Sequence, residues 1–320
     1  MNDFIVYSID MPIRFRGLTQ RHGVLFRGRA GWAEWSPFDD YAPAQAATWL
    51  RAAREAADEG YPAPVRTSIP VNVTIPATDP ATAHRLAAQS GCRTAKIKVA
   101  EPGQTLGDDL ARVEAVRDAL GPDAAIRVDA NGGWSLDQAE HALAELSRFG
   151  LEYAEQPCAA VEDLALLRRK MVHHDVRIAA DESIRRAEDP YRVKQLEAAD
   201  VAILKVQPLG GVRACLRLAE DIGLDVVVSS AVETSVGLRA GIALAAALPE
   251  LPYACGLNTA PLLAADVVTD PLVAVDGSIP VREIEVDPGL VDRVRADDAL
   301  TRQWAERLAQ CEAVMEADHG

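Results

Sequence analysis

The chain has 320 residues, 49% hydrophobic and 25% charged, which is typical of a globular protein and excludes a disordered or fibrous one. Its net charge of −15 argues against nucleic acid or an anionic membrane as a partner, because like charges would repel. The five cysteines form no C-x-x-C pair, which indicates reduced thiols and a cytoplasmic protein. The N-terminus lacks a signal pattern, and the longest apolar stretch, 240–249, is too short to span a bilayer.

The first 68 residues predict the N-terminal part of a capping domain. Strand-like pieces at 4–9 and 23–28 precede turn residues in GWAEWSPFDDYAP, and a helix is predicted over 44–60. The segment 262–320 is punctuated by Pro and Asp and ends in a predicted helix near 298–315. We expect this C-terminal segment to return to the cap.

Residues 69–261 alternate short apolar runs with amphipathic stretches, the pattern of βαβ units in a parallel sheet. Strands are predicted at 71–75, 95–99, 125–129, 151–155, 177–181, 201–206, 224–230 and 253–257. Eight strands close a barrel filled by side chains, and no nucleotide-binding glycine motif favours an open sheet. The predicted class is therefore α/β, a (β/α)7β TIM-like barrel with a small α+β capping domain formed by the two terminal segments.

Ionisable residues stand at the ends of five consecutive predicted strands, where the loops of a (β/α) barrel face one pocket. In chain order they are Lys96 and Lys98, Asp129, Glu155, Asp181, and Lys205. From Lys98 onward they are separated by 31, 26, 26 and 24 residues. Each interval is about one βα unit, so the same structural position recurs, which scattered surface charges would not do.

The three carboxylates at these strand ends predict a metal site. Two carboxylates 4 Å apart repel by about 4 kcal/mol at an effective dielectric constant of 20, so a positive partner is needed. Oxygen ligands without His or Cys suit a hard divalent cation. We predict that Asp129, Glu155 and Asp181 bind Mg²⁺, with Mn²⁺ able to substitute.

The lysines flank this cluster and predict proton transfer. Side chains alternate along a strand, so Lys96 and Lys98 point the same way. A lysine is a base only when neutral, and a neighbouring ammonium together with desolvation favours that form. We interpret Lys98 as the proton-transfer group, tuned by Lys96, and Lys205 as its counterpart across the metal. Such a site suits removal of the α-proton of a small-molecule carboxylate, because metal and ammonium stabilise the enediolate.

With K-x-K, D-x-N, E-Q-P, D-E-S and K-x-Q at its strand ends, the chain resembles the enolase superfamily, muconate-lactonizing subgroup. Within that subgroup it is most similar to the actinobacterial o-succinylbenzoate synthases, over nearly the whole chain. The resemblance implies a Mg²⁺-dependent syn dehydration of 2-succinyl-6-hydroxy-2,4-cyclohexadiene-1-carboxylate to 2-succinylbenzoate in menaquinone biosynthesis. It also implies that Lys98 removes the α-proton and then protonates the departing hydroxyl, while Lys205 stabilises the enediolate as a cation.

The resemblance also suggests substrate contacts, in cap loops and at strand ends. The candidates are Arg16, Phe38, Arg127, Asn131, Ser229 and Ser230.

Other functions stay open at this point. N-acylamino acid racemases and dipeptide epimerases of the same superfamily share the metal and both lysines. No histidine ends a predicted barrel strand, which disfavours a histidine base. A noncatalytic binding barrel would not need Lys98 and Lys205 together. The sequence leaves the oligomeric state undetermined, and a monomer is compatible with it.

Overall fold

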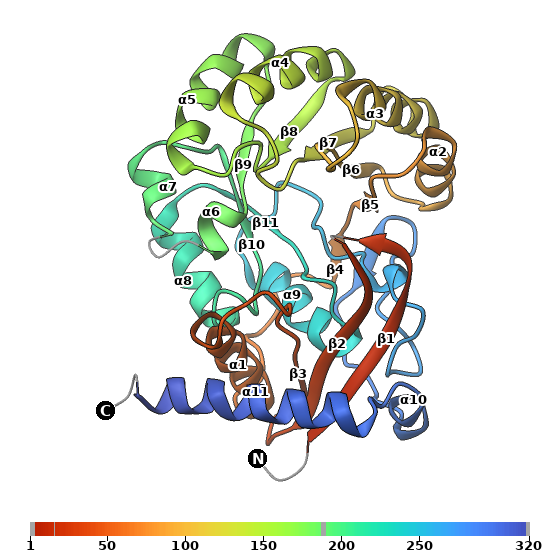
Figure 1. The fold of residues 1–320 in the computed structure, drawn as a ribbon, viewed down its shortest axis with the longest axis vertical. Helices are drawn as coiled ribbons and strands as arrows, with labels where there is room; N and C mark the ends of the chain where they lie inside the picture. Colours follow the sequence, from red (N-terminus) through yellow and green to blue (C-terminus); the bar gives the residue numbers. More distant parts are fainter. Residues whose placement is uncertain (1–3, 16, 187–189, 318–320) are drawn as a thin grey trace.

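The computed structural model describes residues 4–15, 17–186 and 190–317. A curved parallel sheet with helices on its outer side forms the larger part of the molecule, and an antiparallel sheet with two long helices lies below it (Figure 1). The parallel sheet has the strand order β11-β10-β9-β8-β7-β6-β5. Its strands follow one another in chain order, as repeated βαβ units require.

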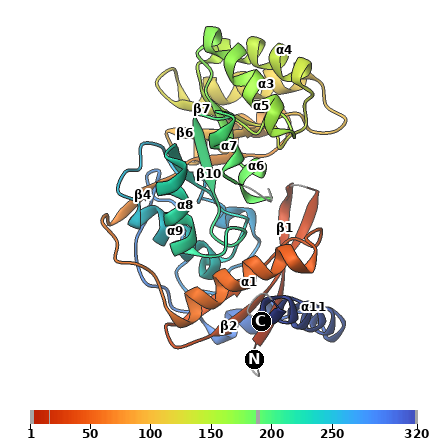
Figure 2. The same ribbon diagram turned by 90° about the vertical axis from the view of Figure 1, so that its left-hand side faces the viewer.

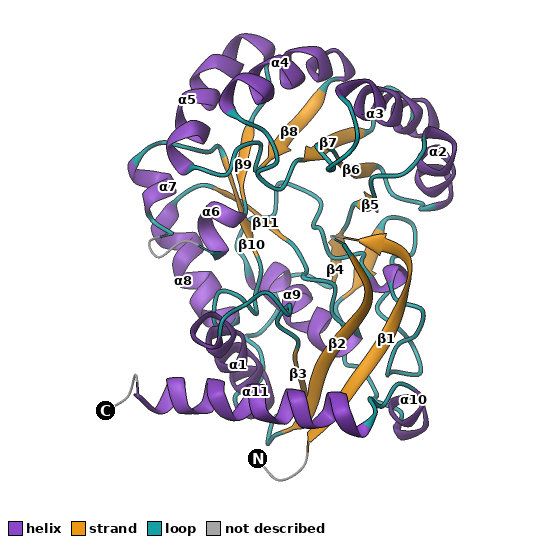
Figure 3. Cartoon of the chain, viewed as in Figure 1, coloured by secondary structure: helices purple, strands orange, loops and turns teal. Residues whose placement is uncertain are grey.

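Strands and helices alternate through the barrel (Figure 3). The strands are β5 (Val73–Ile75), β6 (Thr94–Lys98), β7 (Ala125–Asp129), β8 (Leu151–Glu155), β9 (Ile178–Ala180), β10 (Val201–Leu204) and β11 (Asp225–Val228). The helices are α2 (Pro80–Gln89), α3 (Leu106–Leu120), α4 (Leu136–Leu146), α5 (Val161–Met171), α6 (Glu182–Arg185), α7 (Arg192–Gln195), α8 (Val212–Ile222) and α9 (Ser235–Ala247), with short 3₁₀ turns at Ser147–Phe149, Val172–His174 and Ala260–Leu262.

The predicted eighth strand, 253–257, closes the barrel through single bridges rather than as a regular strand. Cys255 pairs with Val71 and Gly256 with Ser229, both in parallel. The amide of Gly256 donates to the carbonyl of Val228 at 2.8 Å. The segment therefore connects the two ends of the seven-stranded sheet, and the predicted TIM-like barrel with a capping domain is confirmed.

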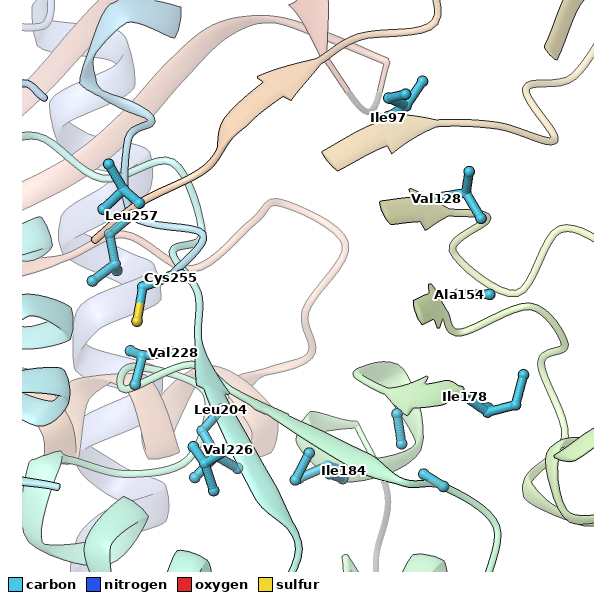
Figure 4. Close-up of a cluster of buried hydrophobic side chains, with 14 of the residues drawn as sticks. Ile97, Val128, Ala154, Ile178, Ile184, Leu204, Val226, Val228, Cys255 and Leu257 are labelled. Atoms are coloured by element: carbon cyan, nitrogen blue, oxygen red, sulfur yellow. The ribbon is translucent and has the colours of Figure 1, made fainter. Parts of the chain in front are cut away.

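The alternation of side chains along the strands separates the barrel into two layers. Ile97, Val128, Ala154 and Ile178 lie on four neighbouring strands and point outward, away from the barrel interior (Figure 4). The residues on either side of each must point inward, because successive side chains face opposite sides of a strand. The lysines and carboxylates of the strand ends occupy those inward positions, while the apolar set packs against the helices.

The cap contains a three-stranded antiparallel sheet, β1 (Phe4–Phe15), β2 (Leu18–Arg27) and β3 (Trp32–Trp35), followed by α1 (Pro43–Asp58). The interpretation of GWAEWSPFDDYAP as turn residues is wrong for its first part, because Trp32–Trp35 pairs with β2. The indole of Trp35 is fully buried. Burial of this large ring offsets the polar neighbours that suggested a turn.

The C-terminal segment lies against the cap. Strand β12 (Ser278–Pro280) pairs with β4 (Ser68–Pro70), and α10 (Pro288–Arg293) precedes α11 (Asp298–Ala317). Helix α11 packs across α1 (Figure 2). The ring of Trp304 meets that of Trp35 edge to face, with 5.4 Å between the ring centroids. The domain boundaries 1–68, 69–261 and 262–320 stay a prediction. Among the described residues, none of the helices is both long enough and apolar enough to cross a membrane.

Glu34 of β3 connects the cap to the barrel. Its carboxylate is buried and accepts hydrogen bonds from the hydroxyls of Tyr7 and Ser36, both at 2.7 Å. The other oxygen accepts from the amide and hydroxyl of Thr234, at 3.1 and 2.5 Å, and from the amide of Gly237 at 3.1 Å. Thr234 is the N-cap of α9, so a cap carboxylate lies at the positive end of a barrel helix.

We predict that Glu34 makes the folding stability pH-dependent. Burial raises the pKa of Glu34 from 4.5 to about 7. The folded protein therefore holds this proton more tightly than the unfolded chain, and the stabilisation it gives below pH 4.5 is lost as the pH rises through 7. In Glu34→Gln the side-chain oxygen can accept from the start of α9, and the side-chain NH₂ can donate to the hydroxyls of Tyr7 and Ser36. Urea unfolding measures the free energy of unfolding of both proteins. Between pH 5 and 8 the difference between them should change in favour of Glu34→Gln by up to about 3 kcal/mol.

Glu34→Ala serves as the control for that prediction. It leaves the donors of Thr234 and Gly237 without partners and should lower stability at every pH. Parallel pH profiles for the natural chain and Glu34→Gln would contradict the assignment.

Candidate active site

One cavity at the carboxyl ends of the barrel strands contains most of the predicted site residues. Lys96 and Lys98 reach it from β6, Asp129 from the end of β7, and Lys205 from the residue after β10. The full lining is Phe38, Thr74, Lys96, Lys98, Asp129, Asn131, Lys205, Ser229, Ser230, Ala231, Val232, Gly256 and Thr259. Phe38 comes from the cap, so cap and barrel both form the walls.

Lys96 lies between two of the predicted metal ligands. Its Nζ donates to the two carboxylate oxygens of Glu155 at 2.8 and 3.0 Å and lies 3.2 Å from Asp129 Oδ2. Burial alone would lower the pKa of Lys96, but Glu155 and Asp129 raise it above its ordinary value. Lys96 is therefore a cation held against the carboxylates. The hypothesis that it also favours the neutral form of Lys98 stays a prediction.

Lys98 faces the cavity on the same side of β6. Its Nζ donates to Asp129 Oδ2 and to Asn131 Oδ1, both at 2.6 Å. Burial would raise the pKa of Asp129, yet Lys98 and Lys96 together hold it below its ordinary value. Asn131 has a left-handed backbone, with φ of 47°, and this turn brings its side-chain oxygen back to Lys98.

Lys205 forms a second charged group across the cavity. Its Nζ donates to Asp181 Oδ2 at 2.6 Å, and Arg185 Nε donates to Asp181 Oδ1 at 2.8 Å. Burial would raise the pKa of Asp181, but these two cations hold it below its ordinary value. Burial lowers the pKa of Lys205, and Arg185 and Lys96 act in the same direction against Asp181.

The three carboxylates influence one another across the strand ends. Burial, the charge of Asp129 and then that of Asp181 raise the pKa of Glu155 to about 7, against Lys96. Glu155 and Asp181 are fully buried and lie behind the lysines rather than in the cavity wall. Across the described residues, no three His, Cys, Asp or Glu side chains are gathered closely enough to hold a metal as they stand. Each of these carboxylates instead faces a lysine.

Among the predicted substrate contacts, Phe38, Asn131, Ser229 and Ser230 line the cavity. The Ser230 hydroxyl already pairs with that of Thr259 at 2.5 Å. Arg16 lies outside the described residues.

The structure does not bring Arg127 to the cavity, so that expectation is corrected. Its guanidinium is buried lower in the barrel, where it donates to Asn72 at 3.1 Å and to Glu152 at 2.5 Å. It also stacks over the rings of Tyr153 and Tyr253. The position two residues before Asp129 has the correct inward direction but the wrong depth, because a strand rises about 3.3 Å per residue.

Sequence reasoning missed several residues around the site. Thr74 lies opposite Lys96 in the sheet register, and Thr259 follows the eighth strand segment. Their place at strand ends was a usable signal. Arg185 stands four residues after Asp181 and reaches it from one helical turn away, so the i,i+4 spacing was also a usable signal. Its η1 nitrogen also donates to the hydroxyl of Tyr41 in the cap.

Comparison with known proteins gives consistent results. Residues 79–298 match the enolase C-terminal domain-like family and 6–57 the enolase N-terminal domain-like family. The chain is 59% identical to o-succinylbenzoate synthase of Thermobifida fusca, over 97% of this chain and 96% of that protein. It is 49% identical to that of Mycolicibacterium smegmatis, over 97% and 95%.

Solved structures support the same fold. A muconate lactonizing enzyme from Pseudomonas fluorescens superposes with a TM-score of 0.78 at 23% identity, over 92% of this chain and 98% of that one. An N-succinyl Arg/Lys racemase from Bacillus cereus gives 0.78 at 21%, over 92% and 97%.

We predict that Arg185 is needed to keep Asp181 buried as an anion. Arg185→Met removes the guanidinium from Asp181 and Glu182, and breaking a buried ion pair costs about 3–5 kcal/mol. Tyr41→Phe removes one hydrogen bond to the same guanidinium and should cost about 1 kcal/mol. Urea unfolding in EDTA measures both. Equal losses in the free energy of unfolding for the two variants would contradict this prediction, because the ion pair would then contribute no more than one hydrogen bond.

Proposed function

The chain belongs to the enolase superfamily and, within it, to the o-succinylbenzoate synthases; on this premise we propose which of its residues carry out the reaction. The enzyme is a lyase that removes water from 2-succinyl-6-hydroxy-2,4-cyclohexadiene-1-carboxylate to give 2-succinylbenzoate. One observation carries the assignment of roles: Lys98 and Lys205 line a single cavity. They come from β6 and the end of β10, on either side of the strands that carry the carboxylates.

Lys98 is the proton-transfer residue in this proposal. Its neutral amine takes the proton from the carbon that bears the carboxylate, and the electron pair of the C–H bond passes into an enediolate. The resulting ammonium then gives that proton to the hydroxyl on the neighbouring ring carbon. The C–O bond breaks, water leaves, and the enediolate collapses to the aromatic ring. One residue serves both steps, which accounts for loss of H and OH from the same face.

Lys205 acts as a cation on the opposite face. Its Nζ donates to Asp181 Oδ2 at 2.6 Å, and the charge of Asp181 favours the ammonium form against the burial that lowers the pKa of Lys205. A fixed positive charge in a site removed from water stabilises negative charge that develops on the substrate carboxylate. Asn131 accepts from Lys98 and orients its nitrogen toward the cavity.

The chemistry of the donor set fits a divalent cation. Asp129, Glu155 and Asp181 supply oxygen ligands, and the raised pKa of Glu155, about 7, reflects burial and negative charges that a cation would balance. We propose that these three residues hold Mg²⁺, for which Mn²⁺ can substitute. The bound ion would act as a Lewis acid on the substrate carboxylate. The lysine contacts of these carboxylates would have to give way when the ion binds.

We predict that Lys98→Ala and Lys205→Ala each lower turnover by several orders of magnitude while Mg²⁺ affinity is largely kept. Loss of the ultraviolet absorbance of the cyclohexadiene acid measures turnover, and isothermal titration measures Mg²⁺ binding. Lys170→Ala is the matched control, because Lys170 pairs with Glu140 at the surface. Near-normal turnover in either cavity variant would overturn the proposed roles.

We also predict that removing the metal abolishes turnover and that Mg²⁺ or Mn²⁺ restores it. Asp181→Asn should weaken Mg²⁺ binding at least tenfold in titrations that do not depend on activity. Glu152→Gln is the control, because Glu152 pairs with Arg127 below the cavity and should bind Mg²⁺ normally. Turnover that persists in EDTA would rule out the metal assignment.

A further inference from the structure

Arg21 of β2 is a buried cap residue that contacts the wall of the cavity from behind. It is only 2% exposed. Its Nε donates to the carbonyl of Val232 at 3.0 Å, and one terminal nitrogen lies 3.3 Å from the carbonyl of Ala231. Both acceptors belong to the loop between β11 and α9, which lines the cavity. A cap side chain thus donates to backbone carbonyls of the barrel in the wall of the cavity.

The same guanidinium also holds the cap's own contribution to the cavity. It donates to the carbonyl of Ser36 and lies over the ring of Phe38, 4.5 Å from its centroid. Phe38 lines the cavity together with both lysines. One buried side chain therefore joins the cap wall and the barrel wall.

Val232 is held in an unfavourable conformation at this point. Its φ is +63°, a left-handed value that is a genuine outlier for a β-branched residue. Such strain persists only where the surroundings over-determine it. Here the Val232 amide donates to Ser230 Oγ at 3.0 Å while Arg21 binds the Val232 carbonyl. Both ends of the strained residue are fixed, and one of the two restraints is Arg21.

We propose that Arg21 is a positioning residue, which fixes Phe38 and Val232 as the wall against which the ring of the cyclic acid packs. The inference rests on the proposed function. Arg21 itself does not line the cavity, so it acts through these two residues. Its loss should loosen the fit of the substrate and leave the metal ligands and lysines in place.

Arg21→Met tests this through steady-state kinetics with the cyclohexadiene acid. KM should rise at least tenfold while kcat, per mole of folded enzyme, falls less than threefold, because uniform binding is lost. Mg²⁺ affinity should stay within twofold. Arg21→Lys should recover only part of the loss in KM, since an ammonium cannot span the carbonyls of Ser36 and Val232 as a guanidinium does. Arg27→Met, at an exposed position of the same strand, should leave KM unchanged.

Two results would overturn the inference. A merely structural role would reduce the folded fraction, so apparent kcat would fall with KM unchanged. A double-mutant cycle adds a second check: glycine adopts positive φ freely, so Val232→Gly should make the further loss from Arg21→Met smaller. Strictly multiplicative effects would contradict coupling through Val232. If the natural chain does not turn over the acid, the proposed function fails instead, whatever Arg21 does.

Discussion

The structure depends on the balance of buried charge at the mouth of the barrel. Asp129, Glu155 and Asp181 are taken out of water, and an isolated carboxylate there would cost several kcal/mol. Every one of them faces an ammonium group, and Asp181 has a guanidinium besides. The cations therefore offset part of the cost of burying these carboxylates before any substrate arrives. In the proposed reaction Lys205 is already removed from water when the substrate arrives, which strengthens its effect on developing negative charge.

Barrel topology explains how such a cluster can be built. The three carboxylates come from the ends of three successive parallel strands, β7, β8 and β9. Parallel neighbours keep strand ends level, as the pairing of Lys98 with Asp129 and of Asp129 with Glu155 indicates. The intervening residues, such as Ile97 and Val128, pack outward against helices. A one-residue slip of any strand would exchange these two sets. The apolar layer therefore specifies the register on which the polar site depends.

This coupling also sets what could be predicted from the sequence. Strand ends were recognisable because apolar runs and charged residues recur with one period, so β7 and β8 have the predicted bounds. The depth of a residue within the barrel could not be recognised from the sequence. The expectation that Arg127 contacts the substrate did not hold for that reason. The strand at Trp32–Trp35 was missed because a distant helix covers Trp35. Arg21 was missed because its partners include backbone carbonyls far away in the sequence, which no local pattern encodes.

The cap contacts the barrel through charged groups as well as apolar ones. The charged contacts restrict the position of the cap relative to the barrel. An apolar interface tolerates small shifts, since burial is nearly independent of direction. Glu34 at the start of α9 and Arg21 at Val232 each need several partners within hydrogen-bond distance, and a displacement of an ångström or two would leave buried charges unsatisfied. Both anchors bind the segment that follows β11 (Asp225–Val228). The same segment begins with Ser229 and Ser230, which line the cavity. These contacts therefore fix the position of the cap relative to the cavity wall. The cap loops, including the one that carries Phe38, are positioned with it.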